Sequence, residues 1–326
     1  MPGFETLVDG FLEAIFVVVD PGKRLYWMHL LAAALLAAIY CKASSRCQSV
    51  SDMTMGLLDI AYWWNRSTKL DYGLFALNNF LKVVMFAPVL GGQIAVSLAV
   101  TKFLHFNIAE SHLVVWPPIA ISIAFTLAAF LLDDFMRFAV HWCMHRVPIL
   151  WHCHKLHHSA TTLTPFTVHR THPLESFINS TRAVLCLGLV SGVFVWLFGH
   201  GLQVWDILGV NALGFAMTLA GSNLRHSHIP VHFGVAEYFL ISPAQHQLHH
   251  SIDHKHPNMG SFLSCWDRLC GSWVSGREAK DLRFGLRVTE RKPGRNTYYP
   301  EGALGISNTN GVLGKGPLTP PRSLAR

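Results

Sequence analysis

The sequence predicts an all-α integral membrane protein with about four to six transmembrane helices. Two observations favour this class. Only 14% of the 326 residues are charged and 51% are apolar, whereas an ordinary soluble domain carries about 25% charge. The apolar residues also form blocks of about 17 residues or more, roughly the length that a helix needs to cross a bilayer core of about 30 Å; these blocks are 25–41, 72–104, 114–132, 183–199 and 202–220. The composition therefore disfavours a secreted domain, a nucleic-acid-binding protein and a disordered scaffold.

Residues 1–132 are predicted to form an N-terminal interfacial helix followed by transmembrane spans. Residues 4–19 contain acidic side chains and lack the basic start of a signal peptide, so we interpret them as an interfacial helix. The block 72–104 is interrupted by Pro88 and by the pair Gly91–Gly92. These residues could kink one tilted span or divide it into a short hairpin.

Basic residues orient the predicted spans. The short loops 105–112 and 200–201 contain no Lys or Arg, which is typical of the outer side of a membrane. The segment 133–182 contains several basic residues and is placed in the cytoplasm; they are Arg137, Arg146, Lys155, Arg170 and Arg182. A five-span topology leaves Lys23 and Arg24 outside, against this rule. The expected location is a bacterial inner membrane, or the endoplasmic reticulum in a eukaryotic cell.

Residues 133–282 are predicted to form a histidine-rich catalytic domain that includes a transmembrane hairpin at 183–220. The two spans of this hairpin are separated by two residues alone, so the chain must return to the side that it left. The segments before and after the hairpin therefore share one face of the membrane, where they cap the spans. Residues 283–326 are rich in Arg, Lys, Gly, Pro and Asn and are predicted to form a flexible basic tail.

Most of the twenty histidines lie in this domain, and their spacing is regular. Eight of them form three boxes: His141-x-x-x-His145, His154-x-x-His157-His158 and His246-x-x-His249-His250. On a helix these spacings place the members of a box on one face. A structural zinc ion takes four ligands, so eight box histidines predict a dinuclear site. Imidazole suits zinc, copper, iron and nickel alike. Further candidate ligands are His172 and His226, and beyond them His169, His228 and His232.

The boxes belong to an ordered set of motifs over about residues 134–273. The set comprises Asp134, His141-x-x-x-His145, Pro148, Trp151, His154-x-x-His157-His158-Ser159, Arg170-Thr-His-Pro-Leu-Glu175, His226-Ser227, Pro243, His246-x-x-His249-His250-Ser251, Asn258, Gly260, Trp266-Asp-Arg268 and Gly271. It resembles the fatty acid hydroxylase and sterol desaturase superfamily. The resemblance implies an integral-membrane non-haem di-iron enzyme that activates O2 and oxidises a C–H bond of a lipid.

Two positions depart from the pattern of many relatives. Trp142 follows the first box histidine where relatives have Arg, and His228 stands where they have Asn in His-Ser-Asn. The second departure leaves open whether His226 alone ligates, or His228 or His232 as well. His169 resembles an additional histidine of the sterol C5-desaturase branch.

The resemblance also implies partners and supporting residues. The expected cofactors are two iron ions, with O2 as co-substrate and a lipid in the bilayer as substrate. No His-Pro-Gly-Gly signature of a fused cytochrome b5 domain occurs in the sequence, so we expect a separate electron donor that is cytochrome b5-like or a ferredoxin with its reductase. Acidic side chains that hydrogen-bond to the ligating imidazoles must orient them. Asp134 is the first candidate, with a helix-terminal charge as its alternative role, and Glu175 and Asp267 are weaker candidates.

Two other functions compete with a lipid oxygenase. A histidine-rich metal transporter would need ionisable residues along its spans, and the apolar blocks contain only Lys82, Lys102 and Asp206. A zinc-dependent membrane hydrolase would need a His-Glu-x-x-His motif, and no box contains Glu. The sequence leaves open the lipid class and the choice between hydroxylation and desaturation.

Overall fold

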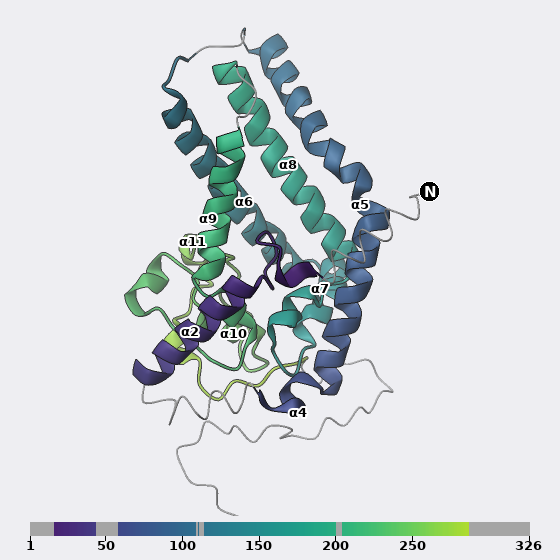
Figure 1. The fold of residues 1–326 in the computed structure, drawn as a ribbon, viewed down its shortest axis with the longest axis vertical. Helices are drawn as coiled ribbons and strands as arrows, with labels where there is room; N and C mark the ends of the chain where they lie inside the picture. Colours follow the sequence, from purple (N-terminus) through teal and green to yellow (C-terminus); the bar gives the residue numbers. More distant parts are fainter. Residues whose placement is uncertain (1–15, 44–57, 109, 111–113, 200–203, 287–326) are drawn as a thin grey trace, which may run out of the picture.

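A computed structural model describes residues 16–43, 58–108, 110, 114–199 and 204–286 (Figure 1). Within these ranges the regular secondary structure is helical, and the only β contacts are two isolated bridges, Leu240 with Leu263 and Ser251 with Phe284. The predicted all-α class is therefore confirmed for the part of the chain that the structure describes.

Four long helices run along the longest axis of the molecule (Figure 1). They are α5 (Arg66–Asn107), α6 (Pro118–Arg146), α8 (Pro173–Phe198) and α9 (Val204–Leu219). Helix α8 packs against α5 and α6, and α9 packs against α6. Helices α8 and α9 run in opposite directions, as the predicted hairpin requires, although the turn between them lies outside the described residues. By length and composition, α6 and α8 could each cross a membrane.

The block predicted as a kinked span or a hairpin belongs to a single helix. Helix α5 contains 42 residues and continues through Pro88 and Gly91–Gly92. It begins at an N-cap, Asn65, whose side chain accepts hydrogen bonds from the backbone at Ser67 and Thr68. At about 1.5 Å per residue the helix is about 63 Å long, roughly twice the thickness of a bilayer core. Part of α5 must therefore extend beyond any bilayer that the bundle crosses.

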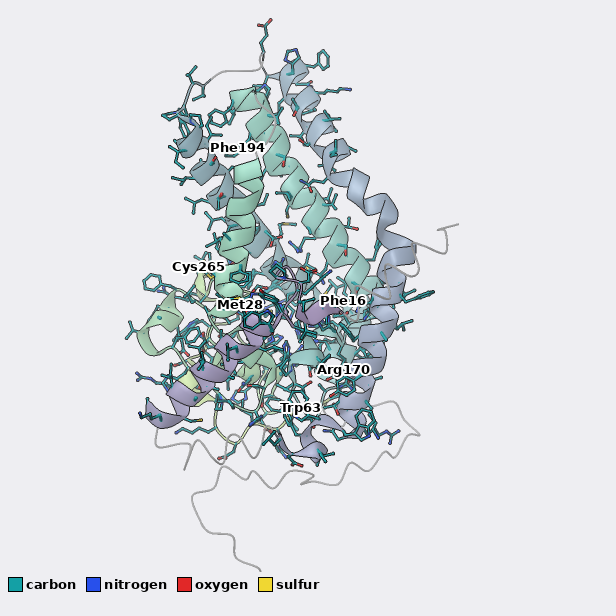
Figure 2. All side chains as sticks on the ribbon, viewed as in Figure 1. Phe16, Met28, Trp63, Arg170, Phe194 and Cys265 are labelled. Atoms are coloured by element: carbon teal, nitrogen blue, oxygen red, sulfur yellow. The ribbon has the colours of Figure 1, made fainter. Side chains whose placement is uncertain are left out.

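The first turns of α5 belong to the opposite end of the molecule from the upper bundle. Asp71 forms a buried ion pair of 3.2 Å with Arg170 and accepts a 2.8 Å hydrogen bond from Thr167. The Asn78 amide donates to the backbone oxygen of Thr171 at 2.9 Å. Figure 2 shows Arg170 at this lower end and Phe194 in the upper bundle.

The lower end consists of short elements between and after the long helices. They are α4 (Ile60–Trp63), α7 (Pro148–His158), η2 (Pro165–His169), η3 (Ser222–His226), η4 (Gly234–Tyr238), α10 (Pro243–His250), α11 (Cys265–Cys270) and η5 (Gly276–Glu278). The predicted domain boundary at 132/133 falls inside α6, because that helix runs unbroken from the apolar bundle to the first histidine box. Of the predicted interfacial helix only the short η1 (Phe16–Val18) is described, and most of the predicted tail lies outside the described residues.

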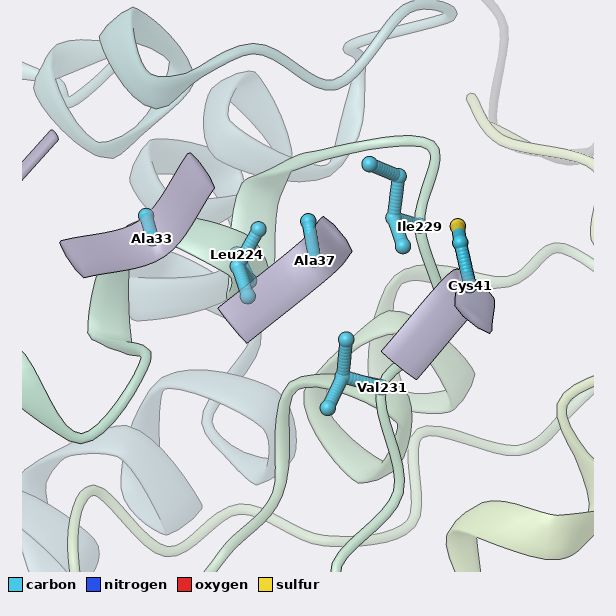
Figure 3. Close-up of a cluster of buried hydrophobic side chains, with 6 residues drawn as sticks. All are labelled: Ala33, Ala37, Cys41, Leu224, Ile229 and Val231. Carbon is cyan, nitrogen blue, oxygen red and sulfur yellow. The ribbon is translucent and has the colours of Figure 1, made fainter. Parts of the chain in front are cut away.

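Helix α2 (Trp27–Ala43) does not occupy the position expected for the first predicted span. It lies at the level of α7 and α10 rather than in the upper bundle (Figure 1). Small side chains at four-residue spacing, Ala33, Ala37 and Cys41, pack on the segment that contains η3, as Figure 3 shows; their partners there are Leu224, Ile229 and Val231. The helix has 17 residues, and the predicted five-span count stays a prediction.

Two glycines allow α8 to approach α5 closely. A Cβ atom at Gly192 would lie 2.7 Å from the backbone oxygen of Ser97, and one at Gly188 would lie 2.7 Å from Val96. The Thr101 hydroxyl donates to the Gly192 carbonyl at 3.0 Å across the same interface. Small residues of this kind let neighbouring helix backbones come into contact in membrane proteins.

We expect Gly192→Ala to destabilise the bundle by about 1–3 kcal/mol, because the added methyl overpacks this contact. Thermal unfolding in detergent measures the effect. Gly73→Ala is the matched control, since a Cβ there meets nothing within 4 Å and alanine is the better helix former. A Gly192→Ala protein as stable as the Gly73→Ala protein would contradict the close packing of α5 and α8.

Candidate metal centre

The first two histidine boxes are joined by a sharp turn between helices. Val147 ends α6 and begins α7, and Pro148 occupies the first turn of α7, where proline fits because it has no backbone N–H to leave unpaired. This arrangement brings His141 and His145, at the end of α6, next to the box of α7.

Helix α10 supplies the third box. Ser242 and Gln245 form a capping box at its start, in which each side chain bonds to the backbone of the other residue. Leu248 on this helix is completely buried. The short helix η3 ends at His226, which packs against α10 and α7.

Nine histidines converge into two groups within the described residues. In each group one ring nitrogen from every member lies within 4.8 Å of all the others. The five-histidine group consists of His141, His145, His154, His158 and His249, and the four-histidine group consists of His157, His226, His246 and His250. All eight box histidines and His226 are thus brought together at one end of the molecule, as the sequence predicts.

Each His-x-x-His-His box contributes to both groups. The first and last histidines of the α7 box, His154 and His158, enter the five-histidine group, while His157 enters the other. The α10 box does the reverse, because His246 and His250 enter the four-histidine group and His249 does not. An α-helix turns about 100° per residue, so residues i and i+4 point in similar directions and residue i+3 points about 100° away from residue i+4. Each of the two boxes therefore supplies histidines to both groups, and in this sense the two groups are interlocked.

The nitrogen spacings fit metal coordination. In the four-histidine group, the Nε2 atom of His226 lies 3.1 Å from that of His246, 3.2 Å from that of His250 and 3.3 Å from that of His157. With a metal–nitrogen distance of about 2.1 Å, neighbouring ligand atoms lie about 3.0 Å apart in an octahedron and about 3.4 Å apart in a tetrahedron. A neutral imidazole has one donor and one acceptor nitrogen, so hydrogen bonds cannot satisfy three such contacts at one atom.

Burial keeps these histidines neutral. Desolvation lowers the pKa of His154 and of His157 to about 3. The pKa values of His158, His226, His246, His249 and His250 are also well below 6.5, with desolvation as the main cause and neighbouring histidines as a further one. A metal ligand must be the neutral imidazole, and that form is available at neutral pH.

Outer hydrogen bonds orient three members of the five-histidine group. The Nδ1 atom of His154 lies 2.9 Å from a carboxylate oxygen of Glu175, and those of His141 and His249 lie 2.8 Å from the backbone oxygens of Met259 and Pro257. Each contact favours a proton on Nδ1 and leaves Nε2 free to bind a metal. In the other group, the Nδ1 atoms of His157, His246 and His250 are buried without a hydrogen-bond partner among the described residues.

The acidic residue that touches a histidine is Glu175, not the first candidate, Asp134. The Asp134 carboxylate is completely buried and accepts hydrogen bonds from the backbone of Phe262 and Leu263 and from the Trp266 ring. It is therefore neither a partner of an imidazole nor a solvated charge at a helix end. Its partners are three N–H groups of a segment far away in the sequence, and sequence spacing does not show them.

Asp134 and Asp267 instead hold the loop that orients His141. Asp267 accepts 2.7 Å hydrogen bonds from the backbone of Met259 and Gly260. Asp134 binds the same loop two residues farther along, at Phe262. These contacts fix the Met259 carbonyl against the His141 ring, so both carboxylates support the metal centre indirectly.

Four other predicted ligands lie outside both groups. The Nδ1 atom of His172 accepts a hydrogen bond from the backbone of Leu174 and caps the start of α8. His169 packs on Phe75, His228 on Tyr62 and His232 on Tyr40, each through ring contacts. The geometry therefore favours His226 alone among the candidates left open in its segment.

Comparison with known proteins agrees with this geometry. Residues 126–272 match the fatty acid hydroxylase family, and this range includes all nine converging histidines. Over this range the chain is similar to members of the fatty acid hydroxylase and sterol desaturase superfamily.

Three curated relatives illustrate the range of the superfamily. Alkylglycerol monooxygenase from Danio rerio is 26% identical over 58% of this chain and 41% of its own length. A probable Delta(7)-sterol 5(6)-desaturase from Neurospora crassa is 28% identical over 43% of this chain and 35% of its own. Very-long-chain aldehyde decarbonylase GL1-1 from Oryza sativa is 26% identical over 49% of this chain and 25% of its own length. The chain thus spans less than half of the length of these relatives. No solved structure gives a significant match.

We expect His154→Ala or His226→Ala to lower the metal content from two ions to about one ion per chain, because each change removes a member of one group only. Elemental analysis of purified protein measures this. His152→Ala is the matched control, since His152 is exposed on the same helix as His154 and bonds to Pro148. Loss of metal from the His152→Ala protein, or full retention by both ligand variants, would disagree with the two groups.

We also expect the metal-free protein to lose stability as the pH falls from 7.5 to 5.5. Unfolded histidines bind protons below about pH 6.5, whereas His154 and His157 bind them only near pH 3 in the folded state. Between these values the unfolded state holds more protons, so acidification favours it, by about 1.4 kcal/mol for each such histidine over this pH range. Thermal unfolding at the two pH values measures the change, with pH 7.5 against 8.5 as the control. Equal stability at pH 7.5 and 5.5 would show that these histidines are not buried as neutral bases.

Proposed function

We propose that this protein is a membrane-bound non-haem di-iron oxygenase that uses O2 and two electrons to hydroxylate or desaturate a lipid. The observation that carries the proposal is the pair of interlocked histidine groups at the end of a long apolar helical bundle. Relatives named a monooxygenase and desaturases support oxidation of a lipid by such a centre.

Iron is the metal that this proposal needs, because a strong C–H bond demands a redox-active metal. When bound, a pair of iron ions would supply the activation of O2 with two electrons from outside. The donor set fits, since imidazole is a suitable ligand for iron and the Nε2 atom of His249, buried and without a hydrogen-bond partner among the described residues, belongs to the five-histidine group.

The chain's own residues hold and orient this centre. The nine histidines would provide the ligands, and Glu175 keeps the proton of His154 on Nδ1. Asp134 and Asp267 fix the loop whose Met259 carbonyl orients His141. Complete or near-complete burial of His158, His249 and His250 excludes water from the centre.

The helical bundle is the proposed membrane anchor and the route by which a lipid reaches the centre. Helix α6 exposes a stripe of apolar side chains at four-residue spacing; they are Ile119, Ile123, Leu127, Leu131 and Phe135. A contiguous apolar surface of this kind marks contact with a membrane or a partner. The stripe leads along the helix that carries His141 and His145, so a lipid beside α6 would lie close to the metal centre. We further propose that the centre faces the cytoplasm and receives electrons from a separate cytochrome b5-like protein or a ferredoxin with its reductase.

We expect cells that express the wild-type gene to gain a lipid whose mass is changed by about +16 or −2, as insertion of one oxygen or removal of two hydrogens requires. His157→Ala should reduce this product to less than about a tenth, which corresponds to a loss of about 1.4 kcal/mol in transition-state stabilisation. The exposed residue His152 on the same helix is the control, and His152→Ala should retain the product. Lipid profiles by mass spectrometry measure both.

A purified protein that holds zinc but no iron after anaerobic preparation with iron supplied would contradict the proposed oxygenase. So would a His157→Ala protein with more than about a tenth of wild-type turnover, since His157 is a member of the four-histidine group.

A further inference from the structure

A buried arginine lies directly beside the four-histidine group and has no ion-pair partner in the part of the chain that the structure describes. Arg225 precedes His226 in η3, and only 6% of its surface is exposed. Its guanidinium lies 5.5 Å from the centre of the Phe262 ring. Within the described residues, its side chain makes no hydrogen bond or salt bridge, and its Nε atom is buried without an acceptor. Burial of a charged guanidinium without a partner is unfavourable in free energy. Binding of an anion at this position would offset that cost.

Two further arginines add positive charge to the same region. The side-chain amide of Asn223, two residues before Arg225, donates to the backbone oxygen of Arg24 at 2.8 Å, which places Arg24 beside η3. Burial, as the main cause, and the charges of Arg24 and Arg137 together lower the pKa of Arg225 to about 9. Burial and the charge of Arg137 likewise lower the pKa of Arg24, to about 10. The three guanidinium groups therefore repel one another.

Arg24, Arg137 and Arg225 form what we call the arginine cluster. The carboxylates near this cluster do not neutralise its charge. Asp133 pairs with both Arg137 and Arg182, so one carboxylate serves two arginines. Asp134 partly offsets the charge of Arg225, but its oxygens accept hydrogen bonds from Phe262, Leu263 and Trp266. Four arginines thus face two carboxylates.

The cluster lies between the apolar bundle and the histidines. Arg137 precedes His141 by one turn of α6 on the side of the bundle, and Arg225 adjoins His226. An acidic head group bound there would therefore lie close to the histidines. Because His226 is a member of the four-histidine group, Arg225 lies next to that group.

We propose that Arg24, Arg137 and Arg225 bind the acidic head group, a carboxylate or a phosphate, of an anionic lipid substrate. Guanidinium groups pair with both kinds of anion through charge-assisted hydrogen bonds. This inference rests on the proposed function, because it assigns a substrate class to that metal centre. It selects acidic lipids over neutral lipids such as sterols and fatty alcohols.

Binding of two lipids with the same chain length tests the proposal without any turnover. The full chain is placed in nanodiscs of phosphatidylcholine, and the Kd values for radiolabelled palmitate and 1-hexadecanol are measured by scintillation proximity. We expect palmitate to bind about tenfold more tightly than hexadecanol, a difference of about 1.4 kcal/mol. Arg225→Gln and Arg24→Gln should remove that difference and leave the Kd for hexadecanol unchanged, whereas Arg225→Lys should retain part of it.

Arg268→Gln is the matched control, because Arg268 lies in α11, is exposed and contacts the Tyr238 ring. This variant should retain the wild-type preference for palmitate over hexadecanol. Arg24 is only partly buried, so Arg24→Gln keeps the test valid if Arg225→Gln fails to fold. Equal Kd values for the two lipids in wild-type protein, or an unchanged preference in both glutamine variants, would overturn the proposal.

Competition identifies the source of the anion. Displacement of palmitate by millimolar inorganic phosphate would indicate a site for a free anion and would overturn the assignment to a lipid. Displacement by phosphatidylglycerol in the discs, but not by inorganic phosphate, would support a lipid site that accepts a phosphate head group as well as a carboxylate. Selective palmitate binding by a protein that oxidises no lipid would support the anionic-lipid site and contradict the proposed oxygenase function. Failure of the proposed site and failure of the proposed function are therefore distinguishable.

Discussion

The structure depends on the mutual approach of nine neutral imidazoles. Their nitrogens lie within 4.8 Å of one another in each group, and no pattern of hydrogen bonds among neutral rings satisfies all the contacts at His226. A cation in each group, as proposed above, would resolve this conflict. Metal binding would then stabilise this end of the molecule, because the same contacts are unfavourable without it.

Several features of the fold serve this constraint. Helix α6 joins the apolar bundle to the first box without a break, so the position of the bundle sets the position of His141 and His145. Buried carboxylates outside the two groups then hold the surrounding loops: Asp134 and Asp267 fix the loop that contacts His141, and Glu175 contacts His154 directly. The five-histidine group has these outer supports, whereas the three box histidines of the other group have none at Nδ1 among the described residues.

Much of this arrangement could be predicted from the sequence, because it depends on local periodicity. The apolar blocks predict the long helices, and the spacing of the boxes predicts that each lies on one helical face. The division of each box between two groups could not be predicted, since it depends on how α7 docks against α10. The same holds for Asp134 and His172, whose partners are backbone groups of a distant loop and of their own helix start. The lateral packing of helix α2 could not be predicted either, because small apolar residues suit both a bilayer and a packed interface.

The most direct test of the account is an experimental structure of the iron-loaded protein with anomalous scattering data recorded at the iron edge. The account predicts two peaks per chain. One peak should lie within bonding distance of His154, His158 and His249, and the other of His157, His246 and His250, so that each box serves both ions. A single peak, or a peak coordinated by His154, His157 and His158 together, would contradict the interlocked centre.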